Sequence, residues 1–97
     1  MSLQKIPSCH LCLGSCKTRK KYPCSGIFGD TQKKFYKKLY EECERLCCRD
    51  PKCLSFDHRM LTKYDYNCAI IYETKDDAGK SYKTGTCGDV DFWNHYE

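Results

Sequence analysis

Four cysteines lie within residues 43–53, in the stretch "ECERLCCRDPKC" (42–53), and two of them, Cys47 and Cys48, are adjacent. Cysteines spaced this closely can hold a metal, flank catalytic groups on a helix, or form disulfide bonds. The chain has 10 cysteines in 97 residues, a density typical of small extracellular domains whose cores need cross-links. The disulfide interpretation therefore fits the composition directly. A metal site would need further ligands, and a catalytic site would need further catalytic side chains.

A zinc site is the first of these alternatives. Cys9 and Cys12 have the C-x-x-C spacing of a zinc ligand pair, with His10 and Cys16 nearby. A tetrahedral site needs a second such pair, and the cluster at 43–53 contains no C-x-x-C. A redox role for Cys9 and Cys12 would need a preceding strand and a lowered thiol pKa. We expect no metal and no other cofactor.

Catalysis is the second alternative. Paired cysteines on a helix resemble those of the secreted phospholipases A2, in which a histidine–aspartate pair follows on the same helix. Here Arg49, Asp50 and Pro51 follow instead, and the proline ends the helix. The histidines (His10, His58 and His95) are scattered, so each is expected to be a surface or interface side chain, and no nucleophile–base pair is evident. We expect the protein not to be an enzyme.

Residues 32–49 have the clearest periodicity and predict an amphipathic helix. At 100° per residue, Cys43 and Cys47 share an apolar, buried face, and Cys48 points towards the opposite side, from where it would reach a peripheral segment such as the N-terminal arm. Lysines line that opposite face: Lys33, Lys34, Lys37 and Lys38. Pro51 predicts the end of the helix.

After the helix the period changes to two. Strands are predicted in 53–59, 67–73 and 90–96, with a hairpin loop between the first two and turns around Gly79, Gly85 and Gly88. In the last strand Trp93 opposes the inward alternation, so we expect it either to be an exposed contact for a protein partner or to pack under the N-terminal arm. The sequence predicts an α+β fold, a small disulfide-rich domain with one amphipathic helix packed on an antiparallel sheet.

The pattern "EECERLCCRDPKCLSFDHR…NCAIIYE…FWNHYE" resembles the PAN/apple superfamily, and the cysteine doublet is similar to that of its MANSC/MANEC branch. The resemblance covers residues 25–97, which it implies form one PAN/apple-like domain, preceded by a cysteine-rich basic arm at 1–24. By position it implies the disulfides Cys43–Cys68 and Cys47–Cys53, and Cys24–Cys87 as a tie between the two ends. The pairing of Cys9, Cys12, Cys16 and Cys48 stays open.

The formal net charge of +4 is unevenly distributed. Residues 1–40 contain nine Lys/Arg and one acid, whereas residues 41–97 contain eight Lys/Arg and twelve acids. We expect a basic ligand-binding surface, and an ordinary solvated surface is the alternative. The residues proposed for it are Lys17, Arg19, Lys20, Lys21, Lys33, Lys34, Lys37 and Lys38.

The resemblance implies a secreted, non-enzymatic recognition module that binds a protein or a sulfated glycosaminoglycan such as heparin, as part of a larger secreted or cell-surface protein. Specific nucleic-acid binding is not expected, and no apolar stretch is long enough to cross a bilayer. No secretory signal is visible at residues 1–16, so we expect a mature fragment behind a short leader. A stand-alone secreted effector, such as a toxin or defence peptide, is the alternative function.

Overall fold

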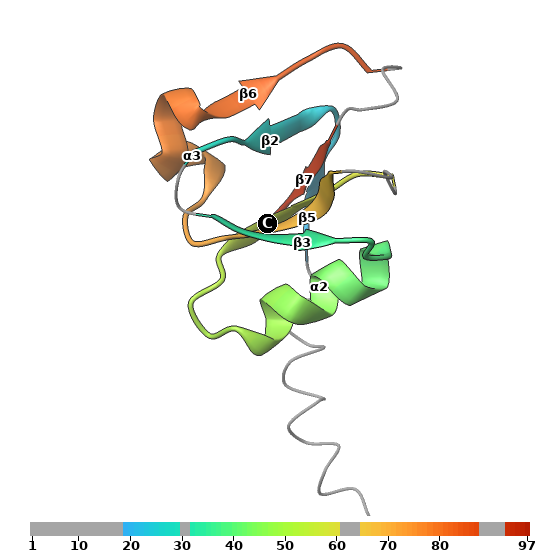
Figure 1. Ribbon diagram of the computed structural model, residues 1–97. Coiled ribbons are helices and arrows are strands. Elements are labelled where there is room, and N and C mark those ends of the chain that lie inside the picture. Colours follow the sequence, from blue (N-terminus) through green and yellow to red (C-terminus); the bar gives the residue numbers. More distant parts are fainter. Residues whose placement is uncertain (1–18, 30–31, 61–64, 88–92) are drawn as a thin grey trace, which may run out of the picture.

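The computed structural model describes residues 19–29, 32–60, 65–87 and 93–97, and these form three layers. The middle layer is a five-stranded sheet in the order β1-β7-β4-β5-β3, and every neighbouring pair is antiparallel. Helix α2 (Tyr40–Arg49) lies below this sheet in Figure 1, and a two-stranded sheet lies above it. The fold is therefore the α+β arrangement that the sequence predicts, with a helix packed on an antiparallel sheet.

The five strands of the main sheet are short. They are β1 (Lys21–Tyr22), β3 (Gln32–Tyr36), β4 (Ser55–His58), β5 (Tyr66–Ile71) and β7 (Asn94–Tyr96). Strands β4, β5 and β7 fall inside or next to the three predicted strand segments. Residues 90–92 of the last segment and the loop at 61–64 lie outside the described residues.

The second sheet was not predicted. It pairs β2 (Ser25–Ile27) with β6 (Tyr82–Thr84), and the short helices α3 (Lys75–Ala78) and η1 (Gly79–Ser81) precede β6. The segment "TKDDAGKS", predicted as a turn, therefore contains one helical turn, which Thr74 caps by accepting a hydrogen bond from the Asp77 backbone N–H. Because this layer covers the upper face, strand β4 is buried on both sides: Ser55, Phe56 and Asp57 are all buried.

The predicted helix over 32–49 is wrong in its first half. Residues 32–36 pair with β5 as strand β3, Lys37 has a positive φ of 53°, and α2 begins only at Tyr40. A lysine face on the helix therefore does not exist. Phe35 instead packs against the core from a strand. The helix prediction fails here because an apolar pattern over so few residues fits a period of two as well as one of 3.6.

Helix α2 itself follows the predicted pattern. Glu42 accepts a hydrogen bond from the Leu39 backbone N–H at 2.8 Å, and the acidic first turn and Arg49 in the last turn complement the helix dipole. The helix ends at Arg49, with Asp50 as its C-cap before Pro51, as expected. Cys43 and Cys47 are its buried residues, so the predicted inner face is confirmed.

Three disulfides have both of their cysteines among the described residues. Cys43–Cys68 links α2 to β5, Cys47–Cys53 links α2 to the following turn, and Cys24–Cys87 joins the residue before β2 to the segment after β6. These are the three pairs that the family resemblance implies. Cys48 is disulfide-bonded as well, and its partner lies outside the described residues, as do Cys9, Cys12 and Cys16.

The core has two parts, one on each side of the main sheet. The helix side contains Cys43, Cys47, Phe56, Cys68, Ile70 and Tyr96, and the opposite side contains Ile27, Ala69 and Ile71. Trp93 is also buried: the Arg59 guanidinium lies 4.5 Å from its ring centroid, and Tyr66 packs beside it at 5.1 Å. It is therefore not an exposed contact for a partner.

Candidate functional site

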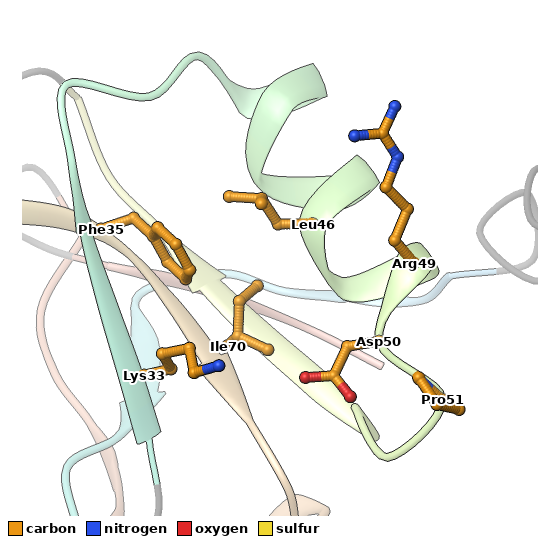
Figure 2. A pocket seen from close by; sticks show the side chains of 7 residues that line it. All are labelled: Lys33, Phe35, Leu46, Arg49, Asp50, Pro51 and Ile70. Carbon is orange, nitrogen blue, oxygen red and sulfur yellow. The ribbon is translucent and has the colours of Figure 1, made fainter.

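A hollow lies between the C-terminal half of α2 and the edge strand β3. Figure 2 shows the seven side chains that line it, and its volume is about 330 Å³. An adjoining hollow shares some of these residues and extends the depression past the end of the helix. The first is lined by Lys33, Phe35, Leu46, Arg49, Asp50, Pro51 and Ile70, and the second adds Lys52 and Tyr72. We call this continuous depression the α2–β3 groove.

The floor of the α2–β3 groove is apolar. Phe35 from β3, Leu46 from α2 and the buried Ile70 from β5 converge on it (Figure 2). Helix α2 packs mainly over β4 and β5, so the helix-side face of β3 is left partly uncovered. The groove is the step between the helix and this uncovered strand.

The rim of the groove is mostly cationic. Lys33, Arg49 and Lys52 line it and are exposed, and Asp50 is the one carboxylate among the lining residues. A rim of this composition attracts anions over several ångströms, because three positive charges surround a low-polarity surface. It suits an acidic ligand that also carries an apolar group.

Asp50 is held by its own hydrogen bonds. Its carboxylate accepts from the Tyr72 hydroxyl at 2.7 Å and from the Lys52 backbone N–H at 3.0 Å. The bond from Tyr72, followed by the one from Lys52, lowers the pKa of Asp50, and the same bond raises the pKa of Tyr72. Asp50 therefore stays ionised and offsets one of the three rim cations, so the rim keeps an excess of positive charge.

The predicted lysines around β3 are split between three places. Lys33 points to the helix side and lines the groove, whereas Lys34 alternates to the other face, where its Nζ lies 4.9 Å from the Tyr66 ring centroid. Lys37 and Lys38 lie in the turn before α2, and the Lys38 backbone N–H donates to Asn67. One residue of this predicted set, Lys33, belongs to the groove.

The other predicted basic residues lie elsewhere. Lys20 and Lys21 lie at β1, at the opposite edge of the main sheet from β3, so the fold separates the two sets. Arg19 is turned inwards: its guanidinium donates to Cys47 Sγ and to the Leu54 carbonyl, and lies over the Phe56 ring. Lys17 lies outside the described residues.

Arg49 and Lys52 were not among the predicted binding residues. In the sequence, "RDPK" predicts the end of a helix, and that pattern gives no role to the two cations on either side of Asp50 and Pro51. Their meeting with Lys33 depends on the pairing of β3 with β5 and on the packing of α2 above it. Sequence spacing gives no signal for that contact.

A buried polar chain centred on His95 lies away from the groove. Its Nδ1 is 2.6 Å from Asp57 Oδ1, its Nε2 is 2.8 Å from Glu97 Oε2, and Asp57 also accepts from the Ile27 backbone N–H. His95 is fully buried, so the first of the two expected placements, at the surface, is wrong for it. Both ring nitrogens face carboxylates, so neither is free to take a proton from a substrate, and the chain is structural.

The charges of this chain follow from its contacts. Burial by itself lowers the pKa of His95, but the hydrogen bonds and charges of Asp57 and Glu97 outweigh burial and raise it. Burial raises the pKa of Asp57. The raised pKa of His95 favours its imidazolium form, in which each ring N–H would donate to one of the two carboxyl groups.

The cysteines that a second zinc pair would need are oxidised. Cys43, Cys47 and Cys53 are in disulfides and Cys48 is disulfide-bonded too, so they supply no thiolate ligands. No group of three or more His, Cys, Asp or Glu side chains suited to a metal ion occurs in the described ranges. The C-x-x-C at Cys9 and Cys12 lies outside them.

Comparisons with known proteins return no relative: no protein-family model, no curated protein and no solved structure matches the chain. Within the part of the chain that the structure describes, no helix has the length and apolar character needed to cross a membrane.

Proposed function

We propose that this chain is a disulfide-stapled recognition module of an oxidising, extracellular environment, of the PAN/apple-like kind, and that it binds an acidic ligand at the α2–β3 groove without catalysing a reaction. The observation that carries this proposal is the cationic rim of Lys33, Arg49 and Lys52 around an apolar floor. Disulfides hold α2 rigidly on the sheet, so the groove keeps its shape without a bound partner.

An acidic protein segment is the ligand that this geometry favours most. The apolar floor of Phe35, Leu46 and Ile70 offers a place for an apolar side chain, which a protein supplies and a sulfated sugar does not. A sulfated glycosaminoglycan is the second candidate. The exposed Lys37, beside Lys33 and Lys34 in one run of the chain, favours it because such polymers contact several cations in succession.

Retention on heparin resin tests the rim. The variant K33A/R49A/K52A removes three positive charges at the groove, and the matched control K20A/K21A/K83A removes three exposed charges elsewhere. Because both variants have the same net charge, a non-specific interaction would lower their elution salt equally. We expect the groove variant to elute at clearly lower salt than the control. Equal elution of the two variants would show that the rim is not the binding surface.

A further inference from the structure

Strand β3 is one of the two edge strands of the main sheet. It stands at one end of the sheet order, and among the described residues it pairs with β5 alone. Every second residue of such a strand turns its backbone N–H and C=O away from its neighbour. In Figure 1 β3 lies directly above α2, at the side of the sheet that the groove borders. Unpaired backbone groups along an edge can pair with another extended chain.

The charge around this edge selects what can pair with it. The segment 32–38, "QKKFYKK", contains four lysines and no acid. Lys33 and Lys34 lie on opposite faces of the strand, so an added strand would meet a cation on each side. A second copy of this strand would be repelled by like charge, whereas an acidic strand would be attracted to it.

The groove supplies the side-chain pocket that strand addition needs. A strand added beside β3 would lie about 4.8 Å from it and would turn alternate side chains towards the helix side. Those side chains would lie next to Lys33 and Phe35, at the mouth of the hollow that Leu46 and Ile70 complete (Figure 2). The opposite side chains would meet Lys34 and Tyr36, of which Tyr36 is 57% exposed.

From these observations we propose that β3 binds an extended acidic peptide segment of a partner protein as an additional strand, with one apolar side chain of that segment in the α2–β3 groove. This inference rests on the proposed function and makes it more specific. Backbone hydrogen bonds to β3 provide the binding energy, and the lysines and the groove select acidic and apolar side chains at alternate positions. A sulfated glycan lacks the peptide backbone needed for such pairing.

The test uses a blocked synthetic peptide, acetyl-Asp-Glu-Phe-Glu-Val-Glu-Asp-amide, titrated against the disulfide-intact chain. Two further peptides have the same side chains but carry backbone N-methyl groups. One is methylated at the odd-numbered positions of the peptide and the other at the even-numbered positions. Strand addition requires the N–H groups of one alternation only. We expect one methylated peptide to bind at least tenfold more weakly than the parent peptide and the other to bind within about twofold of it.

Amide hydrogen exchange provides the second readout. At saturating parent peptide, backbone N–H groups of alternate residues within 32–36 should exchange at least tenfold more slowly, because they become hydrogen-bonded. Protection confined to one alternation would distinguish strand addition from a purely ionic contact of the lysines. The exchange of β1 amides, at the opposite edge, serves as the internal control.

Three outcomes contradict strand addition, and they differ in what they leave of the proposed function. Equal binding of both methylated peptides, with no protection in β3, would overturn the inference and leave an acidic-ligand groove in place. Absence of peptide binding up to about 1 mM, together with heparin retention that depends on the rim, would assign the groove to sulfated glycan. If the peptide does not bind and heparin retention does not depend on the rim residues, both proposals are overturned.

Discussion

At the scale of single residues, the most constrained group is His95. It is enclosed by Asp57 and Glu97, which bond to its two ring nitrogens, and by the rings of Tyr22 and Tyr82, which pack against it. Lys75 is the nearby cation: its backbone N–H donates to Glu97, and its Nζ lies 5.0 Å from the Tyr22 ring centroid. The contacts of His95 join β7 to β4 and to the start of α3, and its raised pKa means that folding favours the protonated ring.

This arrangement predicts that stability falls as the pH rises. The pKa of His95 is raised above its ordinary 6.5 in the folded state, so its contribution is complete below that pH and is lost as the pH rises through the folded value. Burial raises the pKa of Asp57 above its ordinary 3.8, so its contribution also falls as the pH rises, but in a window that begins near pH 3.8. The change in stability at neutral and alkaline pH therefore rests on His95. We expect urea denaturation to give a lower free energy of unfolding at pH 9 than at pH 6.

The variant D57N isolates the contribution of the Asp57–His95 pair to stability. It removes the charge that holds the His95 proton but keeps an oxygen for the Ile27 backbone N–H. We expect a loss of about 3 kcal/mol at pH 6, because His95 loses a buried counter-charge, and a flatter dependence on pH. The control is D76N, which removes the exposed carboxylate that pairs with Lys75. It should change the free energy of unfolding by less than about 0.5 kcal/mol. An unchanged pH profile in D57N would contradict the role of the pair.

At the scale of elements, two disulfides that close loops of different length hold α2 in place. Cys43–Cys68 closes a loop of 25 residues, and Cys47–Cys53 closes one of 6. In the chain-entropy account, a loop of the first size contributes about 3.5 kcal/mol and one of the second about 2.2 kcal/mol. We expect C43A/C68A to lower the free energy of unfolding more than C47A/C53A does, measured by urea denaturation. The reverse order would show that packing, not chain constraint, dominates these cross-links.

The sequence predicts the elements best where local and tertiary preferences agree. In 40–49 the apolar spacing, the acidic first turn and Pro51 all indicate one helix, and the structure has it. In 32–36 the local and tertiary preferences disagree. Phe35 fits the apolar face of a helix, yet the segment pairs with β5 as a strand, and the positive φ of Lys37 separates it from α2. The pairing partner lies over thirty residues away, so no local pattern could give it. Strands β2 and β6, three residues each, are too short for periodicity to detect.

The candidate site was predicted in part, for the same reason. The basic run of the sequence predicts Lys33 as a binding residue, although the helix face on which it is expected does not exist. Arg49 and Lys52 join it only because β3 pairs with β5 beneath the end of α2. The basic run itself is divided by strand alternation, which sends Lys33 and Lys34 to opposite faces. Composition therefore indicates a cationic surface, and topology decides which cations share it.

At the scale of the whole molecule, the uneven charge along the chain does not become one basic face. The N-terminal basic residues Lys20 and Lys21 enter the sheet at β1, and Lys33 and Lys34 enter it at β3, four strand positions away. With neighbouring strands about 4.8 Å apart, the two edges are separated by roughly 19 Å, beyond the Debye length of about 8 Å at physiological salt. The two basic edges therefore act as separate surfaces, which makes K20A/K21A/K83A an informative control for the groove.

The remaining whole-molecule question is whether the folded state survives without its disulfides. A domain of this length has a net stability of about 5–15 kcal/mol, and each native disulfide contributes about 2–4 kcal/mol. Cys24–Cys87, Cys43–Cys68 and Cys47–Cys53 together therefore account for much of the stability, because each core half contains few side chains. We expect the reduced and alkylated chain to be unfolded at 25 °C, with loss of the near-ultraviolet circular dichroism of buried Trp93. Each single-pair variant should keep that signal. A native-like signal in the fully alkylated chain would show that packing alone specifies the fold.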